Sequence, residues 1–535
     1  MGTTARRSIW AWGLESEEPS KADRKAEAKR MAEEYGTVVD PPPLPTIDRV
    51  DIRAPRIQAP DALATICSHD KHDRAAHAYG RSYPDKLRAF QGDFRNAPDL
   101  VAYPSSEAEV TAVLEWCSDN GYAAIPYGGG SSVVDGVNPP EGYDGIVTID
   151  LTRLDQVLEI DESSRAARIQ AGVLGPALEA QLKPHGYTLR HFPQSFEFSS
   201  LGGWIVTRSG GHYATNHTHI DDFVESVRMV TPRGVWESRR LPGSGAGPSP
   251  DRLVIGSEGI LGIVTEAWMR IQKRPRFRAS AGVRFPDWAA GYEGTRQVVQ
   301  AKLWPANLRL LDPAEAQKGS GLDGKQSLLI IGFESAEVPQ GAFIQEAVAI
   351  ARAAGGQIDD DAIVVDDGTG KPTGRGGNVG AWRDWFIRAP YAKNTQVGLG
   401  LIADTFETAI TWDRFPEFDA AVRTAMTDIL QRVCGGGEIA CRFTHVYPDG
   451  PAPYYTYAGF GTPGAELEQW NMIKAAGSDA VMNAGGTITH HHAVGRMHRP
   501  WYDAQRPDLF AGALREAKRS LDPNGVLNPG VLIDP

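Results

Sequence analysis

Phe192–Arg208 reads FPQSFEFSSLGGWIVTR, and a second stretch, Val254–Ile271, reads VIGSEGILGIVTEAWMRI. In both stretches, glycines and small hydroxyl residues stand where apolar, strand-like runs begin or end. Glycine lets a backbone come into contact with a bound group, and serine or threonine beside it supplies hydrogen-bond donors. Tight turns in a sheet protein explain either stretch equally well when it is taken alone. A glycine loop upstream completes the set.

That loop is Gly128-Gly129-Gly130-Ser131-Ser132, and it follows the predicted strand Ala123–Tyr127 directly. Contiguous glycines offer several unencumbered backbone N–H groups to one concavity, an arrangement that suits a pyrophosphate. The spacing is not the GxGxxG of dinucleotide-binding folds, and no Gly-Lys-Ser/Thr of a P-loop is present. For the pentapeptide by itself, a flexible loop remains the alternative.

The composition describes a water-soluble protein of several domains. With 535 residues, 41% of them hydrophobic and 23% charged, the chain exceeds a single ordinary core and predicts two or three domains. A formal net charge of −12 argues against nucleic acid as a partner. The four cysteines form no CxxC pair, no apolar run reaches the length of a membrane span, and no secretory signal is visible. We expect a cytoplasmic location without a transmembrane segment.

The pattern along the chain predicts four parts. Residues 1–95 form a helical extension, with a helix capped by Ser20 and with Trp10 and Trp12 docked onto the body. Residues 96–275 alternate strands and helices. Residues 276–475 form a second α+β domain, and residues 476–535 form a C-terminal segment.

Within these parts the patterns predict individual elements. Strands are expected at 100–103, 123–127, 146–151, 167–171, 223–231, 235–238 and 328–333, and helices at 106–120, 174–183, 341–353 and 420–433. A hairpin-like turn at 161–164 joins the strands at 146–151 and 167–171. Loops are expected at 241–251 and at 366–380, the second with six glycines and suited to cover a site.

Five segments together resemble the FAD-binding flavoproteins of the vanillyl-alcohol oxidase superfamily, and within it the alkyl-dihydroxyacetonephosphate synthase family. They are PYGGGSSVVDGV, PQSFEFSSLGGWIVTRSGG, GSEGILGIVTE, THHHAVGR and LDPNGVLNPG. The resemblance extends from about residue 85 to the C-terminus. It implies an α+β fold: a two-part FAD-binding domain of the PCMH type, an α+β substrate or cap domain, the helical N-terminal extension, and a C-terminal segment that completes the flavin site.

The resemblance also implies a set of cofactor residues. The stretch 126–132 would hold the pyrophosphate, 194–200 and 207–210 would follow the flavin and ribityl chain, and 258–264 would close over the adenine side. FAD is expected to be noncovalent, although His191 would lie near the isoalloxazine, where relatives carry a covalent link. The full set is Pro126, Tyr127, Gly128, Gly129, Gly130, Ser131, Ser132, His191, Gln194, Ser195, Phe196, Glu197, Phe198, Ser199, Ser200, Thr207, Arg208, Ser209, Gly210, Glu258, Gly259, Ile260, Leu261, Gly262, Ile263, Val264 and Asn528.

Three adjacent histidines, His490, His491 and His492, follow the strand-like run Gly486–Thr489. On a strand, the first and third would share one face while the second points to the other, which argues against a metal site. A polar strand end is the structural alternative. We favour proton transfer and binding of a phosphate or oxyanion, because histidine titrates near neutral pH.

Three further residues are candidates for catalysis or substrate binding. By resemblance, Tyr454 matches the catalytic tyrosine of the synthases, and neighbouring histidines could lower the pKa of its phenol. Arg309 matches an arginine that the synthases need. Lys393 stands where the synthases carry an active-site arginine, so the charge is kept but the planar fork is lost. Arg388 lies close by in the sequence and could replace that arginine.

Two enzymatic functions follow. In the first, the resemblance implies that the acyl group of acyl-dihydroxyacetonephosphate is exchanged for a fatty alcohol through a flavin N5 adduct, the step that makes the ether bond of ether lipids. In the second, a 2-hydroxy acid or an alcohol is oxidised by hydride transfer to flavin N5. A flavin-binding protein without turnover is the non-enzymatic alternative. The partners expected are a small-molecule or lipid-like substrate, peripheral contact with a membrane, and a second copy of the chain in a homodimer.

Overall fold

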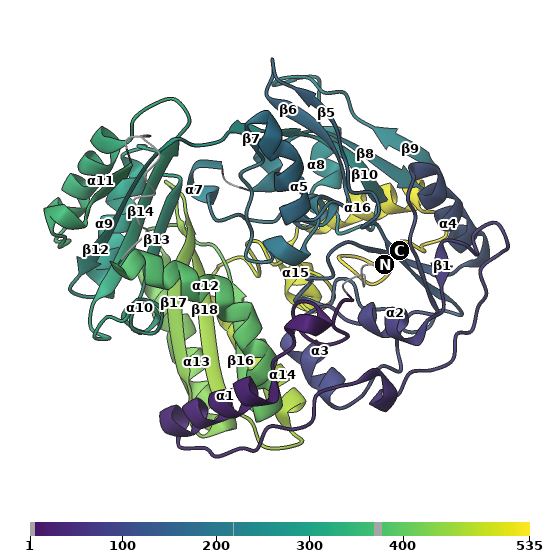
Figure 1. Ribbon diagram of the computed structural model, residues 1–535, viewed down its shortest axis with the longest axis horizontal. Coiled ribbons are helices and arrows are strands. Elements are labelled where there is room, and N and C mark those ends of the chain that lie inside the picture. The colour runs from purple at the N-terminus through teal and green to yellow at the C-terminus, as the bar shows by residue number, and fades with distance from the viewer. Residues whose placement is uncertain (1–5, 218, 367, 369–376, 535) are drawn as a thin grey trace.

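The computed structural model describes residues 6–217, 219–366, 368 and 377–534. Its strands form three larger sheets and one short pair, β11 (Gln272–Lys273) with β7 (Tyr187–Thr188). Two of the larger sheets lie on one side of the molecule and a seven-stranded sheet lies on the other (Figure 1). The boundary that we propose at residues 275/276 lies between β11 and the first strand of the seven-stranded sheet.

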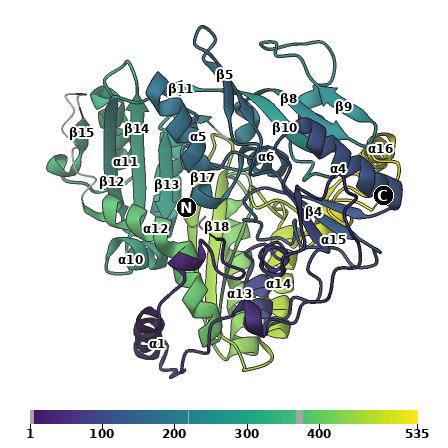
Figure 2. The ribbon, with the colours of Figure 1, turned by 45° about the vertical axis from the view of Figure 1, so that its right-hand side comes forward.

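The N-terminal extension contains three α-helices, namely α1 (Lys21–Tyr35), α2 (Lys71–Ala76) and α3 (Tyr83–Phe90). As the sequence predicts, the Ser20 hydroxyl caps α1 by accepting from the Asp23 N–H at 3.1 Å. Trp10 and Trp12 are buried, so the start of the chain is docked onto the body. Figure 2 shows α1 at the lower edge of the molecule, beside the seven-stranded sheet.

The first sheet has the order β1-β2-β4-β3, with β1 (Cys67–Ser68), β2 (Leu100–Ala102), β3 (Ala123–Tyr127) and β4 (Ile146–Asp150). Strands β2, β4 and β3 run parallel, and helix α4 (Glu107–Asn120) connects β2 to β3. These strands are almost wholly buried, as continuous apolar runs in a parallel sheet should be. The strand β3 delivers the chain to the glycine loop 128–132.

The second sheet is antiparallel, with the order β5-β6-β10-β8-β9. Its strands are β5 (Val157–Asp161), β6 (Ala166–Gln170), β8 (Val224–Thr231), β9 (Gly234–Glu237) and β10 (Ile263–Arg270). Its helices are α5 (Gly175–Leu182), α6 (Leu201–Thr207), α7 (Ala214–His217) and α8 (Pro250–Val254).

Two predictions for this region were wrong, and a third differs from the structure only at its end. The turn at 161–164 joins β6 to β5, a half-exposed strand that its weak apolar pattern concealed. The run LGGWIVT is helix α6 rather than a strand, because Ser200 caps it through the Gly203 N–H and its apolar face packs into the core. The predicted loop 241–251 ends in the start of α8, which Ser249 caps through the Arg252 N–H.

The seven-stranded sheet is antiparallel and has the order β15-β12-β14-β13-β17-β18-β16. Its strands are β12 (Phe277–Phe285), β13 (Asn307–Leu311), β14 (Ser327–Ser335), β15 (Val364–Asp366), β16 (Leu401–Glu407), β17 (Glu438–Val446) and β18 (Pro451–Phe460). One face packs on α9 (Trp288–Gln300), α11 (Gly341–Ala353), α13 (Phe415–Cys434) and α14 (Glu466–Asn483). On the other face lie α10 (Pro313–Ser320) and α12 (Gly377–Gln396).

Of the glycine-rich loop predicted at 366–380, residues 367 and 369–376 lie outside the described residues, and 377–380 begin α12. The C-terminal segment contains α15 (Arg499–Gln505) and α16 (Asp508–Leu521) and then returns to the first sheet. There the Ala124 N–H donates to Val526 O at 2.8 Å, and the Asn528 N–H donates to Ala124 O at 3.0 Å. Among the described residues, no helix is both long and apolar enough to cross a membrane.

Candidate active site

A cavity of about 830 Å³ lies between the glycine loop, β10, helix α12 and the strands β16–β18. Most of the residues predicted from the sequence line it. These are Pro126–Ser132 throughout, Gln194, Ser195, Ser199, Ser200, Thr207, Ser209, Gly210, Glu258, Gly259, Gly262, Ile263, Val264, Arg309, Lys393, Tyr454, His491, His492 and Asn528. Segments more than 300 residues apart in the sequence therefore meet in one space.

The glycine loop is held against the stretch 198–200. A Cβ atom on Gly129 would lie 1.8 Å from the carbonyl oxygen of Phe198, and one on Gly128 would lie 2.0 Å from Ser200 Oγ. Gly130 has a φ of +63°, and its Cβ would collide with the Tyr127 hydroxyl. The packing of the two loops thus requires glycine at 128 and 129, and Tyr127 and the positive φ require it at 130. The backbone of all three lies along the cavity wall.

Helix α12 is joined to the stretch 194–200 by a hydrogen bond to one of its carbonyl groups, which a proline leaves without its usual partner in the helix. Pro390 lies inside α12 and has no N–H, so the carbonyl of Phe386 has no partner from the usual position in the helix. The side-chain amide of Gln194 donates to that carbonyl at 2.9 Å. The stretch is also fixed from within, because the indole N–H of Trp204 donates to Ser199 Oγ at 2.7 Å.

Glu258, in the loop between α8 and β10, connects that loop to the C-terminal segment. Its carboxylate is buried and accepts the Val494 and Gly495 N–H groups at 2.9 and 2.8 Å. Burial nevertheless raises the pKa of Glu258 to about 7. The amide of Asn528 donates to the Glu258 carbonyl at 2.7 Å, and its buried Oδ1 has no partner among the described residues. That oxygen is an acceptor at the cavity wall for a ligand donor.

Several predicted residues do not line the cavity, namely His191, Phe196, Glu197, Phe198, Arg208, Ile260, Leu261 and His490. His191 is buried between Trp204 and Phe223, and burial lowers its pKa to about 3. Arg208 forms an ion pair with Asp221, and Glu197 accepts from the Tyr391 hydroxyl. Ile260 and Leu261 belong to the apolar core. Of these, His191, Ile260 and Leu261 are buried, whereas Glu197 and Arg208 are exposed.

The three histidines lie on a loop, so the prediction of a strand there was wrong. Their backbone N–H groups all donate to one buried carboxylate, that of Glu407 at the end of β16, over 2.6–3.1 Å. Burial opposes ionisation of Glu407, but its imidazole neighbours and the Thr489 hydroxyl outweigh burial and hold its pKa well below the usual range. In a strand, successive N–H groups point to opposite sides of the chain, so three consecutive N–H groups can reach one carboxylate only where the backbone turns.

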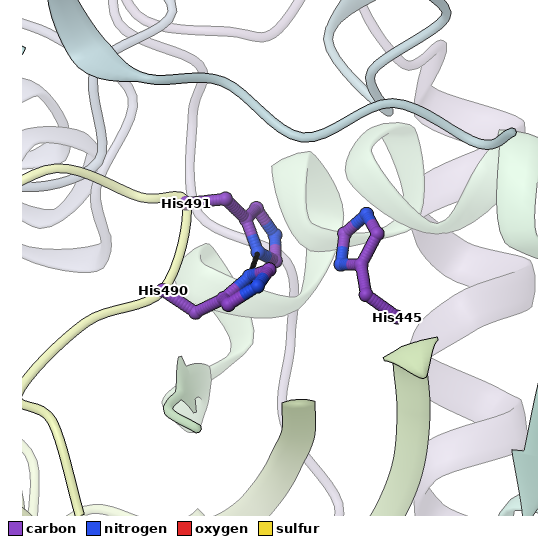
Figure 3. Close-up of side chains that lie close together, drawn as sticks. All are labelled: His445, His490 and His491. Carbon is purple, nitrogen blue, oxygen red and sulfur yellow. Dashed lines mark hydrogen bonds between the residues drawn. The ribbon is translucent and has the colours of Figure 1, made fainter. Parts of the chain in front are cut away.

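Two histidines from other elements complete this cluster. His490 Nδ1 lies 3.0 Å from His491 Nδ1. His445 lies near the end of β17, and Figure 3 shows its ring facing those of His490 and His491. One ring nitrogen each of His445, His490 and His491 lies within 4.8 Å of the other two. The argument against a metal assumed that adjacent histidines point to opposite faces of a strand, so it does not apply to these three. His219 packs against His490 at a centroid distance of 4.5 Å. Burial lowers the pKa of every ring in the cluster, to about 4 for His219 and His491.

Tyr454 lies on β18 beneath these rings. Its hydroxyl donates to Thr405 Oγ1 at 3.0 Å, and the Arg442 guanidinium lies 4.0 Å from the centre of its ring. Burial raises the pKa of Tyr454, while Arg442 and Thr405 only partly oppose that rise. The expectation that histidines lower this pKa was wrong, because burial keeps those imidazoles neutral. The phenol is suited to donate a proton rather than to remove one.

Arg309 on β13 and Lys393 on α12 both line the cavity. Arg309 is buried on β13 between Trp382 and Phe386, its Nε donates to Asn307, and burial lowers its pKa to about 9. One of its terminal nitrogens has no partner among the described residues. Lys393 Nζ lies 4.0 Å from Asp404 Oδ1. Arg388 is exposed beside Tyr391 and does not line the cavity, so it does not replace an arginine at position 393.

Sequence reasoning missed several polar residues of this site. Glu407, His445 and the buried ion pair Arg442–Glu315 carry no motif of their own. The N-terminal extension also lines the cavity, through Trp12 and through residues of α3. The signal available was the exceptional placement of charged residues in otherwise apolar strands, as at Glu407 and Arg442.

Comparison with known proteins identifies the cofactor. A family model described as an FAD binding domain matches residues 98–238, and one described as the C-terminal domain of FAD linked oxidases matches residues 274–532. The chain is 29% identical over 530 residues to alkyldihydroxyacetonephosphate synthase of Dictyostelium discoideum, covering 93% of this chain and 84% of that protein. The chain is an FAD-dependent enzyme similar to the alkyldihydroxyacetonephosphate synthases.

A solved structure of an alkyldihydroxyacetonephosphate synthase matches this enzyme with a TM-score of 0.76 at 27% identity, over 94% of this chain and 92% of that chain. The glycolate oxidase subunit of Bacillus subtilis is 26% identical over 457 residues, covering 82% of this chain and 89% of that protein. The fold is therefore the α+β fold of the vanillyl-alcohol oxidase type, with a PCMH-type FAD-binding domain.

Proposed function

We propose that this enzyme exchanges the acyl group of acyl-dihydroxyacetonephosphate for a fatty alcohol, which would make it an enzyme of ether lipid synthesis. The observation that carries the proposal is the meeting of Tyr454, His491, His492, Arg309 and Lys393 in the same cavity as the glycine loop. The similarity to the synthase of Dictyostelium discoideum over 93% of the chain supports the same reaction. Bound FAD would supply its reactive N5 atom.

In this reaction the entering alcohol loses a proton and the fatty acid leaves as a carboxylate. His491 and His492 line the cavity as neutral imidazoles, since burial lowers the pKa of each to about 4, so each carries one unprotonated ring nitrogen that can take up that proton. Tyr454 keeps its phenol proton, because burial raises its pKa, and would donate a hydrogen bond to the departing carboxylate. Glu407 is a positioning residue, because it fixes the loop that carries both imidazoles.

We further propose that FAD is held noncovalently by 126–132, 194–200, 207–210, 258–264 and Asn528. His191 is turned into the wall rather than into the cavity, which disfavours it as a point of covalent attachment. After acid precipitation, the yellow colour should stay in solution. A yellow pellet would show a covalent link.

The decisive test supplies the purified holoenzyme with a long-chain acyl-dihydroxyacetonephosphate and a fatty alcohol. Release of the fatty acid with formation of the ether product, both followed by mass spectrometry, is the expected result. The alternative is oxidation of a 2-hydroxy acid or an alcohol, and the similarity to a glycolate oxidase subunit supports it. Bleaching of the flavin by lactate or glycolate under anaerobic conditions, without any ether product, would favour that oxidation and overturn the exchange.

A lipid substrate also calls for contact with a membrane surface. We propose peripheral contact through the start of α16, where Leu509 is 90% exposed and Phe510 50% exposed. Co-sedimentation with phospholipid vesicles, compared between the wild type and Leu509→Ser, tests this contact. A homodimer remains a prediction, which the mass in solution will check.

A further inference from the structure

Helix α3, in the N-terminal extension, brings a lysine into the cavity. Lys86 is buried, with 5% of its surface exposed, and lines the same space as Lys393 and Tyr454. Among the residues described, no carboxylate oxygen lies within ion-pair distance of its Nζ, although the neighbouring Asp85 accepts from Ser82 and Asn138. A buried ammonium without an anionic partner is costly unless a ligand supplies the charge.

Lys393, on α12, lines the same cavity, and its positive charge acts on Lys86. Burial, followed by the positive charge of Lys393, lowers the pKa of Lys86 to about 7. The other charged groups that act on Lys86 are Arg81, Asp404 and Asp85. Arg81 points its guanidinium at the carbonyl oxygens of Gly80 and Ser8, so it adds positive charge rather than neutralising it.

Asp404 is a shared counter-ion that cannot balance both lysines. It lies on β16, 4.0 Å from Lys393 Nζ through Oδ1, and the same oxygen accepts the Thr405 N–H at 2.8 Å. Its Oδ2 accepts from the indole of Trp470 at 2.8 Å. One carboxylate with both oxygens engaged serves both lysines, so an anionic ligand at this end of the cavity would stabilise the ammonium form of each.

We propose that Lys86 and Lys393 together clamp the phosphate monoester of the substrate, one ammonium on each side of it. This inference rests on the proposed function, because it assigns the phosphate of that substrate to a place in the site. Two ammonium groups on separate helices, α3 and α12, supply the two points of contact that a single lysine cannot provide where an arginine fork is missing. A phosphate dianion matches two cations better than a carboxylate, which carries one negative charge.

The clamp is tested by ligand binding to the holoenzyme, without turnover. Glycerol 3-phosphate is titrated while the flavin absorbance is followed, with glycerol and lactate as comparison ligands. Lys86→Met removes the charge and keeps most of the stem, and it should raise the Kd for glycerol 3-phosphate about 10- to 100-fold, because a charge-assisted contact is lost. Lys86→Arg keeps the charge and should stay within about tenfold of the wild type.

The matched control is Lys318→Met. Lys318 lines the outer part of the same cavity but is already paired with Glu438, so its loss should change the Kd by less than about threefold. If Lys86→Met also binds glycerol 3-phosphate within threefold of the wild type, the clamp is wrong. Lactate binding that depends on Lys86, with no binding of glycerol 3-phosphate, would equally overturn the phosphate assignment.

These outcomes separate the clamp from the proposed exchange reaction. An enzyme that binds glycerol 3-phosphate through Lys86 but forms no ether product would keep the clamp and reject the exchange. Ether formation by Lys86→Met with an unchanged KM for the phosphorylated substrate would keep the exchange reaction and reject the clamp. Retention of FAD and of the thermal unfolding midpoint in Lys86→Met shows that the variant is folded in either case.

Discussion

At the scale of single residues, the hydroxyl of Tyr454 is placed to act on a proton, and Tyr454→Phe removes that hydroxyl alone. We expect the variant to retain FAD and to lose about 10²- to 10⁴-fold in kcat, the usual contribution of a general acid or base. Flavin absorbance and steady-state rates measure the two quantities. The adjacent Tyr455→Phe is the control, because that hydroxyl donates to Asp419 at 2.8 Å inside the core and lies outside the cavity. A loss of less than threefold in Tyr454→Phe would make Tyr454 a packing residue.

Glu407 acts through the backbone that it holds. In Glu407→Gln one carboxylate oxygen becomes an NH₂ group, which cannot accept from the N–H groups of His490–His492. We expect a loss of about 1–3 kcal/mol in the free energy of unfolding, the cost of leaving buried donors without partners. Urea denaturation measures this loss. A decrease in kcat that exceeds any change in KM would show that the imidazoles have been displaced, whereas a purely structural role predicts unchanged rates for the folded fraction.

At the scale of elements, the contact between the glycine loop and the stretch 198–200 shapes the part of the cavity wall where we propose that FAD binds. A methyl group on Gly129 would meet the Phe198 carbonyl at 1.8 Å, and a backbone oxygen cannot rotate away as a side chain can. Gly129→Ala should therefore separate the two loops and yield protein with little or no bound flavin. The ratio of flavin to protein absorbance reports the result.

The control for that substitution is Gly512→Ala in α16, where an added Cβ would meet nothing within 4 Å. It should retain full flavin and gain slightly in stability, because alanine favours a helix by about 1 kcal/mol over glycine. Full flavin occupancy in Gly129→Ala would mean that the packing of the two loops is not what shapes the pyrophosphate site.

At the scale of the whole molecule, buried histidines make stability depend on pH. Burial lowers the pKa of His191 to about 3 and those of His219, His491 and His492 to about 4, and it also lowers those of His445, His490 and His498. Between pH 6.5 and 4 the unfolded chain binds protons that the folded chain excludes, so stability falls as the pH falls. The pKa values of Glu258 and Asp135 are raised to about 7, so these two carboxyl groups increase the stability of the folded chain as the pH falls. They are fewer than the histidines.

We therefore expect the urea unfolding midpoint of the holoenzyme to be lower at pH 5 than at pH 7. Each excluded proton contributes up to about 1.4 kcal/mol per pH unit. His191→Gln, which changes a residue outside the cavity, should reduce the difference between the two pH values. An equal midpoint at pH 5 and pH 7 would contradict the burial of neutral imidazoles.

The sequence by itself determined the local elements and most of the cavity wall. Caps, apolar runs and turn residues act over a few positions, so the helix after Ser20, the strand before Gly128 and the hairpin after Thr231 could be predicted correctly. The glycine motifs indicated a pyrophosphate-binding loop, because the close approach of a backbone to a bound group restricts the residue type locally, and their resemblance to the flavoproteins implied FAD.

Only the tertiary structure decided how the candidate catalytic side chains are held and which additional groups join them. The histidines bend around Glu407, which lies 83 residues before His490 in the chain, and Lys86 lines the same cavity as Lys393 although more than 300 residues separate them. The pKa of Tyr454 rises rather than falls because it is set by burial and by Arg442. Desolvation and charge pairing depend on distance in space, and in this protein the residues that meet in the cavity come from sheets and helices that no local pattern connects.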